Sequence, residues 1–507
     1  MKSDALDTLD NIRDHDDRNA HQVILQALSA MKYSIHSLMS DSEMSKVHET
    51  SLAILEDIGM QIDHAQARSL LHDAGAKTNT SNNIVKFPAE MVEASIEKIP
   101  KTICLAGRDS ENDLSLNCES PFVVRCATGL TAVLDHQSGA YRKATMNDQK
   151  DYAILADALN NVSMAGPLTL QDTPNKTADL HATKILLENQ RKHFMNLTMG
   201  PRNMRYQIEM QLAVRGTREE IKRRPLFHPI ACLISPLYIP ENDIDIMMIA
   251  GEYGLPVKIP VLPMLGASAP VTLAGTLALG NAEVLGAFSV LQTLYPGNPT
   301  LYYLVPSLMD MRTGDCIHAA PENSLLCSAI IQMARSFYHI PSDTGSYFSD
   351  GILLEQAIFQ KGTNLLAAGL CGANIVSGAG CIDGGMAVSF QEFVIDDEII
   401  GFTRRRLSGF EISEETLALE CVRRVGPRGN FIDDIHTLKN FRSQSIFRPK
   451  LFCYQNYSSW KNESRHISER AAESVNFILD NHAVPPLEDH VINELGRIIK
   501  AADAEIT

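Results

Sequence analysis

From residue 121 onward, short apolar runs alternate with longer stretches whose apolar residues recur at helical spacing. A run of about four to eight apolar residues bounded by turn residues predicts a buried strand, and the longer stretches predict helices. The helical patterns at residues 273–295 and 321–338 are long enough to cover a sheet. The predicted strands are residues 122–126, 164–170, 193–198, 226–234, 257–262, 300–305, 338–341 and 373–377. Eight such runs predict an α/β fold, a (β/α)8 TIM barrel.

The chain before residue 121 follows a different pattern. Residues 1–43 are polar and predict a loosely packed extension. From residue 44, Val47, Ile54 and Ile58 recur at helical spacing, and Gly59 marks the end of that helix. A second helix, a strand at residues 84–87 and a helix at 88–98 follow, so residues 44–120 predict an α+β layer. We expect the barrel at residues 121–480 and a C-terminal helix at 481–507.

The acidic balance of the chain narrows the choice of partners. It has 45 Lys and Arg against 61 Asp and Glu, a net charge of −16, which disfavours nucleic acid because phosphate binding relies on cationic side chains. The N-terminus lacks the basic-then-apolar order of a signal peptide, and no apolar run reaches the roughly 18 residues of a membrane span. The ten cysteines form no C-x-x-C pair, which argues against a zinc cluster. We expect a cytoplasmic protein without a metal site or a membrane partner.

Glycines gather near the end of the predicted barrel. Six lie from Gly369 to Gly385, and each weakens a helix or strand by about 0.5 to 1 kcal/mol relative to Ala. They predict tight turns or close approach of the backbone to another group, with ordinary strand-to-helix turns as the alternative. Chemistry in a TIM barrel sits where strands end. That rule selects residues near 171, 228, 265–268, 303–307 and 343–350, and the glycine block with Glu392.

Several segments, taken together, resemble the trimethylamine methyltransferase (MttB-like) family. They are residues 266–276, 392–401, 426–431 and 436–438, and the resemblance runs from about residue 44 to residue 471. It implies a barrel that passes a methyl group from a methylamine to the cob(I)alamin of a small, separate corrinoid protein. It therefore implies no tightly bound cofactor, a corrinoid-protein partner and a homo-oligomer.

The resemblance also bears on the substrate. Family members that use trimethylamine carry pyrrolysine on the loop after the sixth strand, whereas the matching residues 349–356 of this chain are all standard amino acids. A quaternary ammonium already has a neutral amine as its leaving group, so the protein need only hold substrate and corrin in line. The branch without pyrrolysine implies a betaine, such as glycine betaine, as the substrate.

Particular residues suit such a substrate. Aromatic faces bind a trimethylammonium group, at about 0.5 to 2 kcal/mol per ring, and nearby carboxylates stabilise its positive charge. The carboxylate of the betaine needs hydrogen-bond donors from the protein. We expect catalytic roles for Glu392 and Asp350, with capping of the next helix as the alternative for Asp350. The expected substrate-binding residues are Gln171, His228, Tyr303, Asp343, Tyr347, Phe348, Phe390 and His436, and the expected cofactor-binding residues are Gly384 and Gly385. For each ring and His, a role in the core is the alternative.

Two other functions fit these residues. Lys258 lies inside an apolar strand, where it either pairs with a carboxylate or, once burial lowers its pKa, serves as the Schiff-base nucleophile of a lyase or aldolase. A non-catalytic betaine-binding protein is the third hypothesis.

Overall fold

The computed structural model describes residues 35–352, 354–441 and 446–506, and at its centre is a closed barrel of parallel strands. Strand β6 (Val123–Cys126) pairs with β9 (Val162–Ala165), then β10 (His193–Asn196) and β11 (Phe227–Pro229) on one side. On the other side it pairs with β18 (Ile375–Ala379), then β17 (Ser342–Thr344) and β14 (Tyr302–Tyr303).

Residues 257–261 close the ring between β11 and β14. They form parallel bridges from Lys258 to Ile230 and from Val261 to Leu304, and the Val305 N–H donates to the Val261 carbonyl at 2.9 Å. Eight parallel segments in chain order make a (β/α)8 barrel. The predicted fold class is confirmed.

The strand predicted at residues 338–341 was wrong. Residues 333–338 form the end of a helix, because α12 (Pro321–Gln332) continues as the π-helix η5 (Met333–Tyr338), and the strand begins at Ser342. The Tyr338 hydroxyl contacts the Asn281 amide at 2.9 Å and the His48 ring at 3.0 Å, so this aromatic residue anchors the helix layer outside the barrel. A short apolar run fits a buried helix end as well as a strand.

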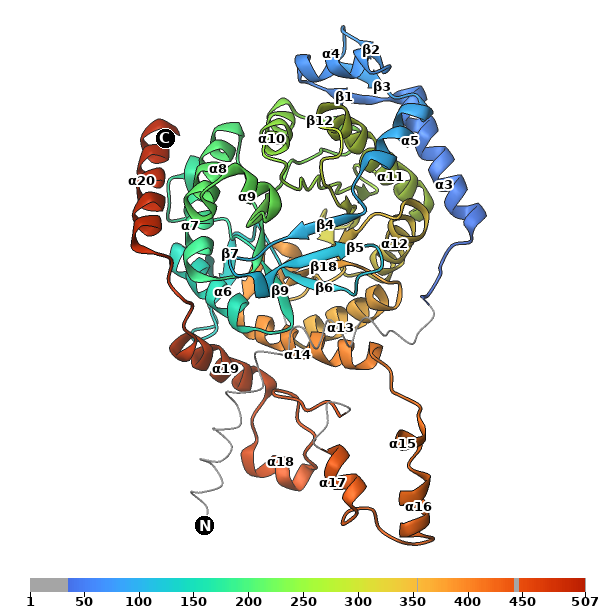
Figure 1. The fold of residues 1–507 in the computed structure, drawn as a ribbon, viewed down its shortest axis with the longest axis vertical. Helices are drawn as coiled ribbons and strands as arrows, with labels where there is room; N and C mark the ends of the chain where they lie inside the picture. Colours follow the sequence, from blue (N-terminus) through green and yellow to red (C-terminus); the bar gives the residue numbers. More distant parts are fainter. Residues whose placement is uncertain (1–34, 353, 442–445, 507) are drawn as a thin grey trace.

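Helices surround the barrel on its outer side (Figure 1). Between the barrel strands the chain forms α6 (Met146–Ala158), α7 (Ala178–Asn189), α8 (Pro201–Arg215), α9 (Arg218–Arg223), α10 (Glu241–Glu252), α11 (Leu273–Leu294), α12 and α13 (Leu354–Leu370), and α14 (Phe390–Leu407) follows β18. The observed α11 and the combined α12 and η5 lie within one residue of the two helices predicted from the pattern.

The N-terminal residues pack against two parts of the barrel. Helix α3 (Asp41–Ala53), the π-helix η2 (Ile54–Ile58), β1 (Met60–Ile62), α4 (Ala65–Asp73), β2 (Lys77–Asn79), β3 (Ile84–Lys86) and α5 (Ala89–Lys98) form an α+β layer against α11. The hairpin of β4 (Thr102–Leu105) and β5 (Leu114–Asn117) lies across the end where the strands begin, since Ile103 and Leu116 pack with Val123 and Ile375. The strand ends at the opposite face therefore form the open mouth.

Helix α11 is long and apolar. Among the described residues it is the one helix long and apolar enough to cross a membrane, and most of its apolar stretch is buried inside the protein. It carries Asn281 and Glu283, both fully buried, and packs against α3, α4, α5 and α12. Burial on all sides is typical of a core helix.

After α14 the chain leaves the barrel. Helices α15 (Glu414–Leu417), α16 (Leu419–Val425), α17 (Ile435–Phe441) and α18 (Tyr457–Glu463) project from the body in Figure 1. We name residues 408–466 the arm. The chain then returns as α19 (Ile467–Asn481), which packs on α14 and α6, and α20 (Asp489–Ile506), which packs on α8 and α7.

Candidate functional site

A layer of polar side chains fills the middle of the barrel. Strand alternation points one residue in two inward, and the inward set of this layer is Arg125, His193, His228, Lys258, Tyr303, Asp343 and Ser377. We name it the lumen cluster. All are at most 6% exposed, so each charge in the cluster needs a partner inside the barrel.

Asp343 is the centre of the charged part of the lumen cluster. Its carboxylate accepts hydrogen bonds from the Lys258 ammonium and the Ser377 hydroxyl, and lies 3.6 Å from the Arg125 Nε. The Lys258 Nζ also sits 3.7 Å from the centre of the Tyr303 ring. Burial, reinforced by the nearby Arg125 charge, lowers the pKa of Lys258 to about 7. The pairing of Lys258 with a carboxylate, one of the two roles expected from the sequence, is thus observed.

The two histidines of the lumen cluster form a short relay. His193 Nδ1 lies 3.1 Å from two backbone carbonyls, those of Ala106 and Pro225, so it carries the proton, and Nε2 accepts from His228 Nδ1 at 2.8 Å. Burial lowers the pKa of His193 to about 4 and holds that of His228 far below its usual value, so both rings are neutral at pH 7. The remaining His228 Nε2 is therefore an acceptor, and it has no partner in the described part of the chain.

A second group lies at the mouth, on the loops after the sixth, seventh and eighth barrel strands. It consists of Cys316, His318, Phe348, Asp350, Gly384 and Gly385, and we name it the mouth cluster. The Phe348 and His318 rings stack with centroids 5.1 Å apart. Both oxygens of the Asp350 carboxylate accept hydrogen bonds from backbone N–H groups of the loop after the sixth strand, those of His318 at 2.7 Å and Ala319 at 2.9 Å. Asp350 thus joins two loops of the mouth.

The glycine turn completes this cluster. Gly384 and Gly385 have φ of +57° and +94°, a region that favours glycine. The Gly384 N–H donates to the Ser349 carbonyl at 2.9 Å. A Cβ on Gly385 would meet the Phe348 ring at 3.4 Å. The expected cofactor-binding glycines, Phe348 and Asp350 therefore form one surface.

Cys316 and His318 were not selected from the sequence. The Cys316 Sγ lies 3.3 Å from His318 Nε2; burial raises the pKa of the thiol and lowers that of the imidazole, so both are neutral at pH 7. The thiol then donates to Nε2, and Nδ1 carries the ring proton, buried and without a partner in the described residues. The sequence signal, a Cys and a His two residues apart after the sixth strand, was present but lay beyond the predicted strand end.

Glu392 lies in a different place from the mouth loops. It is the third residue of α14, fully buried, and its carboxylate is 3.4 Å from the Lys361 ammonium of α13. The same ammonium binds Asp396 at 2.8 Å and lies 5.2 Å from the centre of the Tyr347 ring. Burial raises the pKa of Glu392 to about 8. Asp396 in turn accepts the Gly380 N–H at 2.6 Å, so this buried acid pair supports the start of the glycine loop.

Three expected site residues join none of these groups. Gln171 is exposed, and its amide donates to the Thr169 carbonyl at 3.2 Å. Phe390 is buried in the core and stacks on Tyr152. His436 lies on α17 of the arm. Residues 349–352 and 354–356 follow β17, the seventh strand of the barrel, rather than the sixth as the resemblance implied.

The model of one protein family, described as trimethylamine methyltransferase (MTTB), matches residues 11–507. The chain belongs to this family. Family membership confirms the resemblance seen in the sequence and the methyltransferase class expected from it.

Similar proteins in this family differ in the substrate that their names state. The chain is 29% identical to trimethylamine methyltransferase MttB of Desulfitobacterium hafniense strain DCB-2, over 92% of this chain and 94% of that protein. It is 30% identical to a glycine betaine methyltransferase of strain Y51, over 93% and 98%. The solved structure of monomethylamine methyltransferase MtmB from Methanosarcina barkeri matches with 13% identity and a TM-score of 0.47, covering 99% of this chain and 97% of that one.

Proposed function

We propose that this methyltransferase takes a methyl group from a quaternary amine, a betaine such as glycine betaine, and passes it to the cob(I)alamin of a separate corrinoid protein. The observation that carries this proposal is that residues 349–356, which the resemblance equates with the family's pyrrolysine-bearing segment, are all standard amino acids. At the mouth, Asp350 of this segment accepts the His318 N–H at 2.7 Å, and the His318 ring stacks on Phe348 with centroids 5.1 Å apart. A site without pyrrolysine suits an amine whose nitrogen already carries a fixed positive charge.

The mouth cluster offers complementary contacts for a betaine. The Phe348 ring and the Asp350 carboxylate favour a trimethylammonium group, through the ring's negative face and through direct charge attraction. The unpartnered His318 Nδ1–H is a donor for the betaine carboxylate. The same residues would hold the C–N bond toward the mouth. When that bond breaks, its electron pair stays on the nitrogen, which leaves as a neutral tertiary amine.

The surface around the mouth suits a corrinoid partner. Six exposed apolar side chains follow six different strands of the barrel: Met199, Ile234, Leu262, Met311, Ile352 and Met386, each between 46% and 75% exposed. Exposed apolar residues gathered on one face mark interaction sites. The turn at Gly384 and Gly385 has no side chain to keep a flat macrocycle away from Phe348. The partner's reduced corrinoid would supply the nucleophile for the methyl group.

The test is a substrate panel with the full chain and a reduced corrinoid protein, followed through the cobalt absorption spectrum. We expect methylation with one or more betaines and none with trimethylamine. Rapid turnover of trimethylamine would refute the proposal. Betaine binding without methylation by any corrinoid protein would favour the non-catalytic hypothesis. A cytoplasmic location and a homo-oligomer belong to the same proposal.

The lyase hypothesis keeps one specific support, the lowered pKa of Lys258. Against it, the Lys258 ammonium is fully buried and bound to Asp343, whereas a Schiff-base nucleophile must reach a carbonyl carbon. Borohydride reduction in the presence of carbonyl substrates decides the matter, because only the lyase forms an adduct at Lys258.

A further inference from the structure

We infer that Cys316 is a positioning residue for the substrate: its thiol fixes the tautomer of His318, so that the ring offers its Nδ1–H to the carboxylate of the quaternary amine. The inference rests on the proposed function and deepens it, because it names the contact that distinguishes a betaine from a quaternary amine without a carboxylate. The thiol acts through the ring rather than on the substrate.

Cys316 and His318 face the same side of one extended segment. Strand β16 (Cys316–Ile317) pairs antiparallel with β15 (Ser307–Met309), and Cys316 lies opposite Met309. Side chains two residues apart in an extended chain point to the same face. This arrangement places the Cys316 Sγ 3.3 Å from the His318 Nε2. The pairing of the two strands therefore holds the thiol beside the ring.

The proton between these two side chains lies on the sulfur. Burial raises the pKa of the Cys316 thiol, the Ser307 hydroxyl opposes this rise, and the Asp350 charge adds to it. Burial lowers the pKa of His318 against the attraction of Asp350, so both groups are neutral at pH 7. A ring nitrogen is a full hydrogen-bond acceptor, whereas sulfur is a weak one. The thiol therefore donates to Nε2, and the ring proton stays on Nδ1.

This tautomer leaves one unused donor in the mouth cluster. The His318 Nδ1 is buried and has no partner within residues 35–352, 354–441 and 446–506, and a buried N–H without an acceptor is costly. The other tautomer would present a lone pair at the same place, and a lone pair repels a carboxylate. The Phe348 ring stacked on His318 and the Asp350 carboxylate favour the cationic end of the same ligand.

The ring can be changed without opening the mouth. Asp350 binds the backbone N–H groups of His318 and Ala319, at 2.7 and 2.9 Å, and not the imidazole. These two bonds persist when the side chain of His318 or Cys316 is replaced. Substitutions of the pair therefore test the donor and not the joint between the loops.

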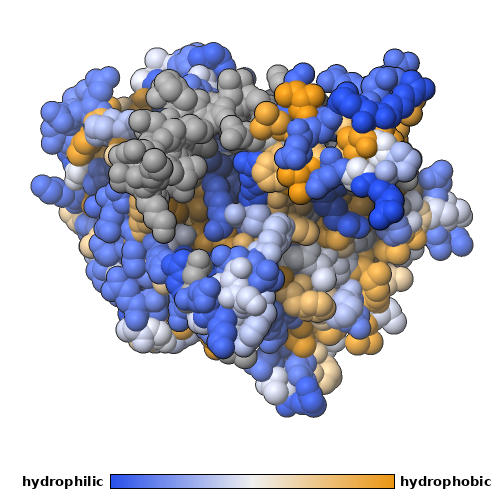
Figure 2. All heavy atoms as spheres, turned by 90° about the horizontal axis from the view of Figure 1, so that it is seen from below, coloured by the Kyte–Doolittle hydropathy of each residue, from blue (hydrophilic) through white to orange (hydrophobic). Residues whose placement is uncertain are grey.

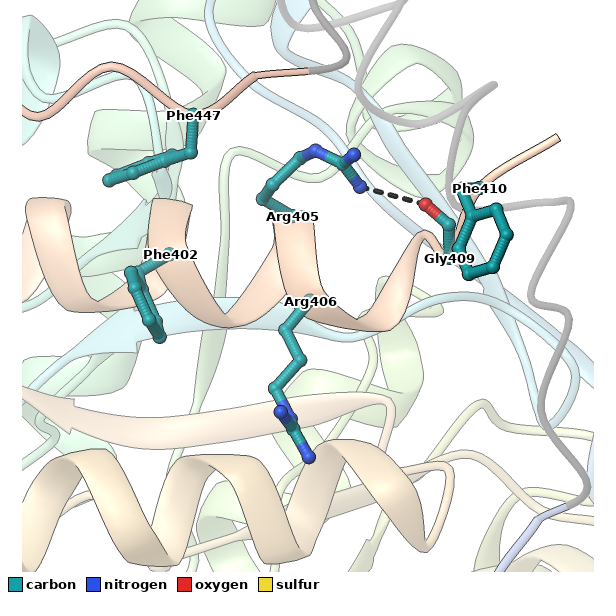
Figure 3. Close-up of a pocket in the computed structure, with 6 residues that line it drawn as sticks. All are labelled: Phe402, Arg405, Arg406, Gly409, Phe410 and Phe447. Atoms are coloured by element: carbon teal, nitrogen blue, oxygen red, sulfur yellow. Dashed lines mark hydrogen bonds between the residues drawn. The ribbon is translucent and has the colours of Figure 1, made fainter. Parts of the chain in front are cut away.

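A hollow at the root of the arm also combines aromatic rings with charged groups. Figure 2 looks onto this end of the molecule, where apolar patches stand among hydrophilic ones. The charged side chains of the hollow are two arginines, which repel a quaternary ammonium, and the Arg405 guanidinium donates to the Gly409 carbonyl at 2.8 Å. The mouth cluster, which has a carboxylate, therefore suits a betaine better. The hollow has about 400 Å³ and is lined by Phe402, Arg405, Arg406, Gly409, Phe410 and Phe447 (Figure 3).

The first test is kinetic and uses the full chain, a reduced corrinoid protein and glycine betaine. The carboxylate contact is the same in the ground state and the transition state, so its loss raises KM and leaves kcat unchanged. We expect KM to rise about 2- to 10-fold in Cys316→Ala and at least about 10-fold in His318→Phe, which keeps a ring beside Phe348 but removes the donor. Cys316→Ser keeps an O–H donor and should behave as the wild type.

A double variant separates positioning from a structural role. In Cys316→Ala/His318→Phe the KM should equal that of His318→Phe alone, because the thiol then has no ring to act on. Tetramethylammonium has the same cation and no carboxylate, so it should inhibit the wild type and both single variants equally. A fall in kcat in Cys316→Ala, an additive effect in the double variant, or weaker inhibition by tetramethylammonium would overturn the inference.

Cys453 on the arm offers a matched control. Its thiol donates to the Gln455 side chain, also two residues further along the chain, at 3.4 Å, and Cys453 is exposed. Cys453→Ala removes the same kind of bond outside the mouth cluster, and KM should not change. An equal rise in KM in this variant would count against a specific role of Cys316.

The second test needs no substrate. Nitrogen NMR of the full chain with isotope-labelled histidines, in which His318 is assigned by its loss in His318→Phe, reads which ring nitrogen carries the proton. We expect a protonated Nδ1 in the wild type at pH 7 and a mixture of tautomers in Cys316→Ala. A wild-type ring protonated at Nε2, or a tautomer that Cys316→Ala leaves unchanged, would overturn the inference. If the wild type transfers no methyl group from any quaternary amine, the proposed function fails, while this measurement still decides whether Cys316 sets the tautomer.

Discussion

Replacing Glu392 by Gln tests the buried acid pair through the pH dependence of stability. Lys361 supplies one positive charge to two buried carboxyls, Glu392 and Asp396, and burial raises the pKa of Glu392 from 4.5 to about 8. Between these values the folded protein binds a proton that the unfolded chain has released. Its stability therefore falls as pH rises through this window.

The magnitude follows from the width of the window. Each pH unit between the two pKa values lowers the free energy of unfolding by about 1.4 kcal/mol. The free energy of unfolding of the wild type should therefore fall by about 4 to 5 kcal/mol between pH 4 and pH 9 because of Glu392. The amide that replaces the carboxyl in Glu392→Gln cannot ionise, so the variant should be no more stable than wild type near pH 5 and clearly more stable at pH 8 to 9.

Urea denaturation from pH 5 to pH 9 measures this difference. The exposed Glu90 on α5 offers a matched control, and Glu90→Gln should follow the wild-type curve. Parallel curves for wild type and Glu392→Gln would refute a buried, protonated Glu392. A loss of methyl transfer without a change in the pH dependence of stability would instead support the catalytic role that was expected from the sequence.

Three further changes test other parts of the molecule. Lys258→Met removes one cation from the buried Asp343 carboxylate. We expect the free energy of unfolding, measured by urea denaturation, to fall by about 3 kcal/mol. An unchanged urea midpoint would contradict the ion pair. Phe348→Leu should lower kcat/KM for a betaine about 2- to 30-fold through loss of the cation–π contact, while Phe359→Leu on the exposed face of α13 should not. Gly378→Ala should destabilise the fold by about 3 kcal/mol, because φ is +133° and a Cβ would lie 2.3 Å from the carbonyl oxygen of residue 347. Gly75→Ala, with φ of +109° and open space around it, should cost clearly less, and equal losses would point to backbone strain alone.

The sequence by itself determined the barrel, the helices around it and the family. Strands of a parallel barrel are buried on both sides, so they appear as short apolar runs, and seven of the eight were located to within a few residues. The exception, residues 338–341, shows where the pattern fails: Tyr338 is buried outside the barrel by contacts with α3 and α11, and burial alone does not distinguish a strand from a helix end.

Only the tertiary structure decided which candidates meet. The rule that strand ends carry the chemistry selected Phe348, Asp350 and the glycine turn, and these do come together. It could not reveal that Cys316 and His318 face them, because that contact joins loops from different strands. It also could not show that Glu392 shares a buried lysine with Asp396, since Lys361 is 31 positions away in the chain. The local pattern of a sequence indicates burial and secondary structure, whereas a site is made by side chains that are distant in sequence and close in space.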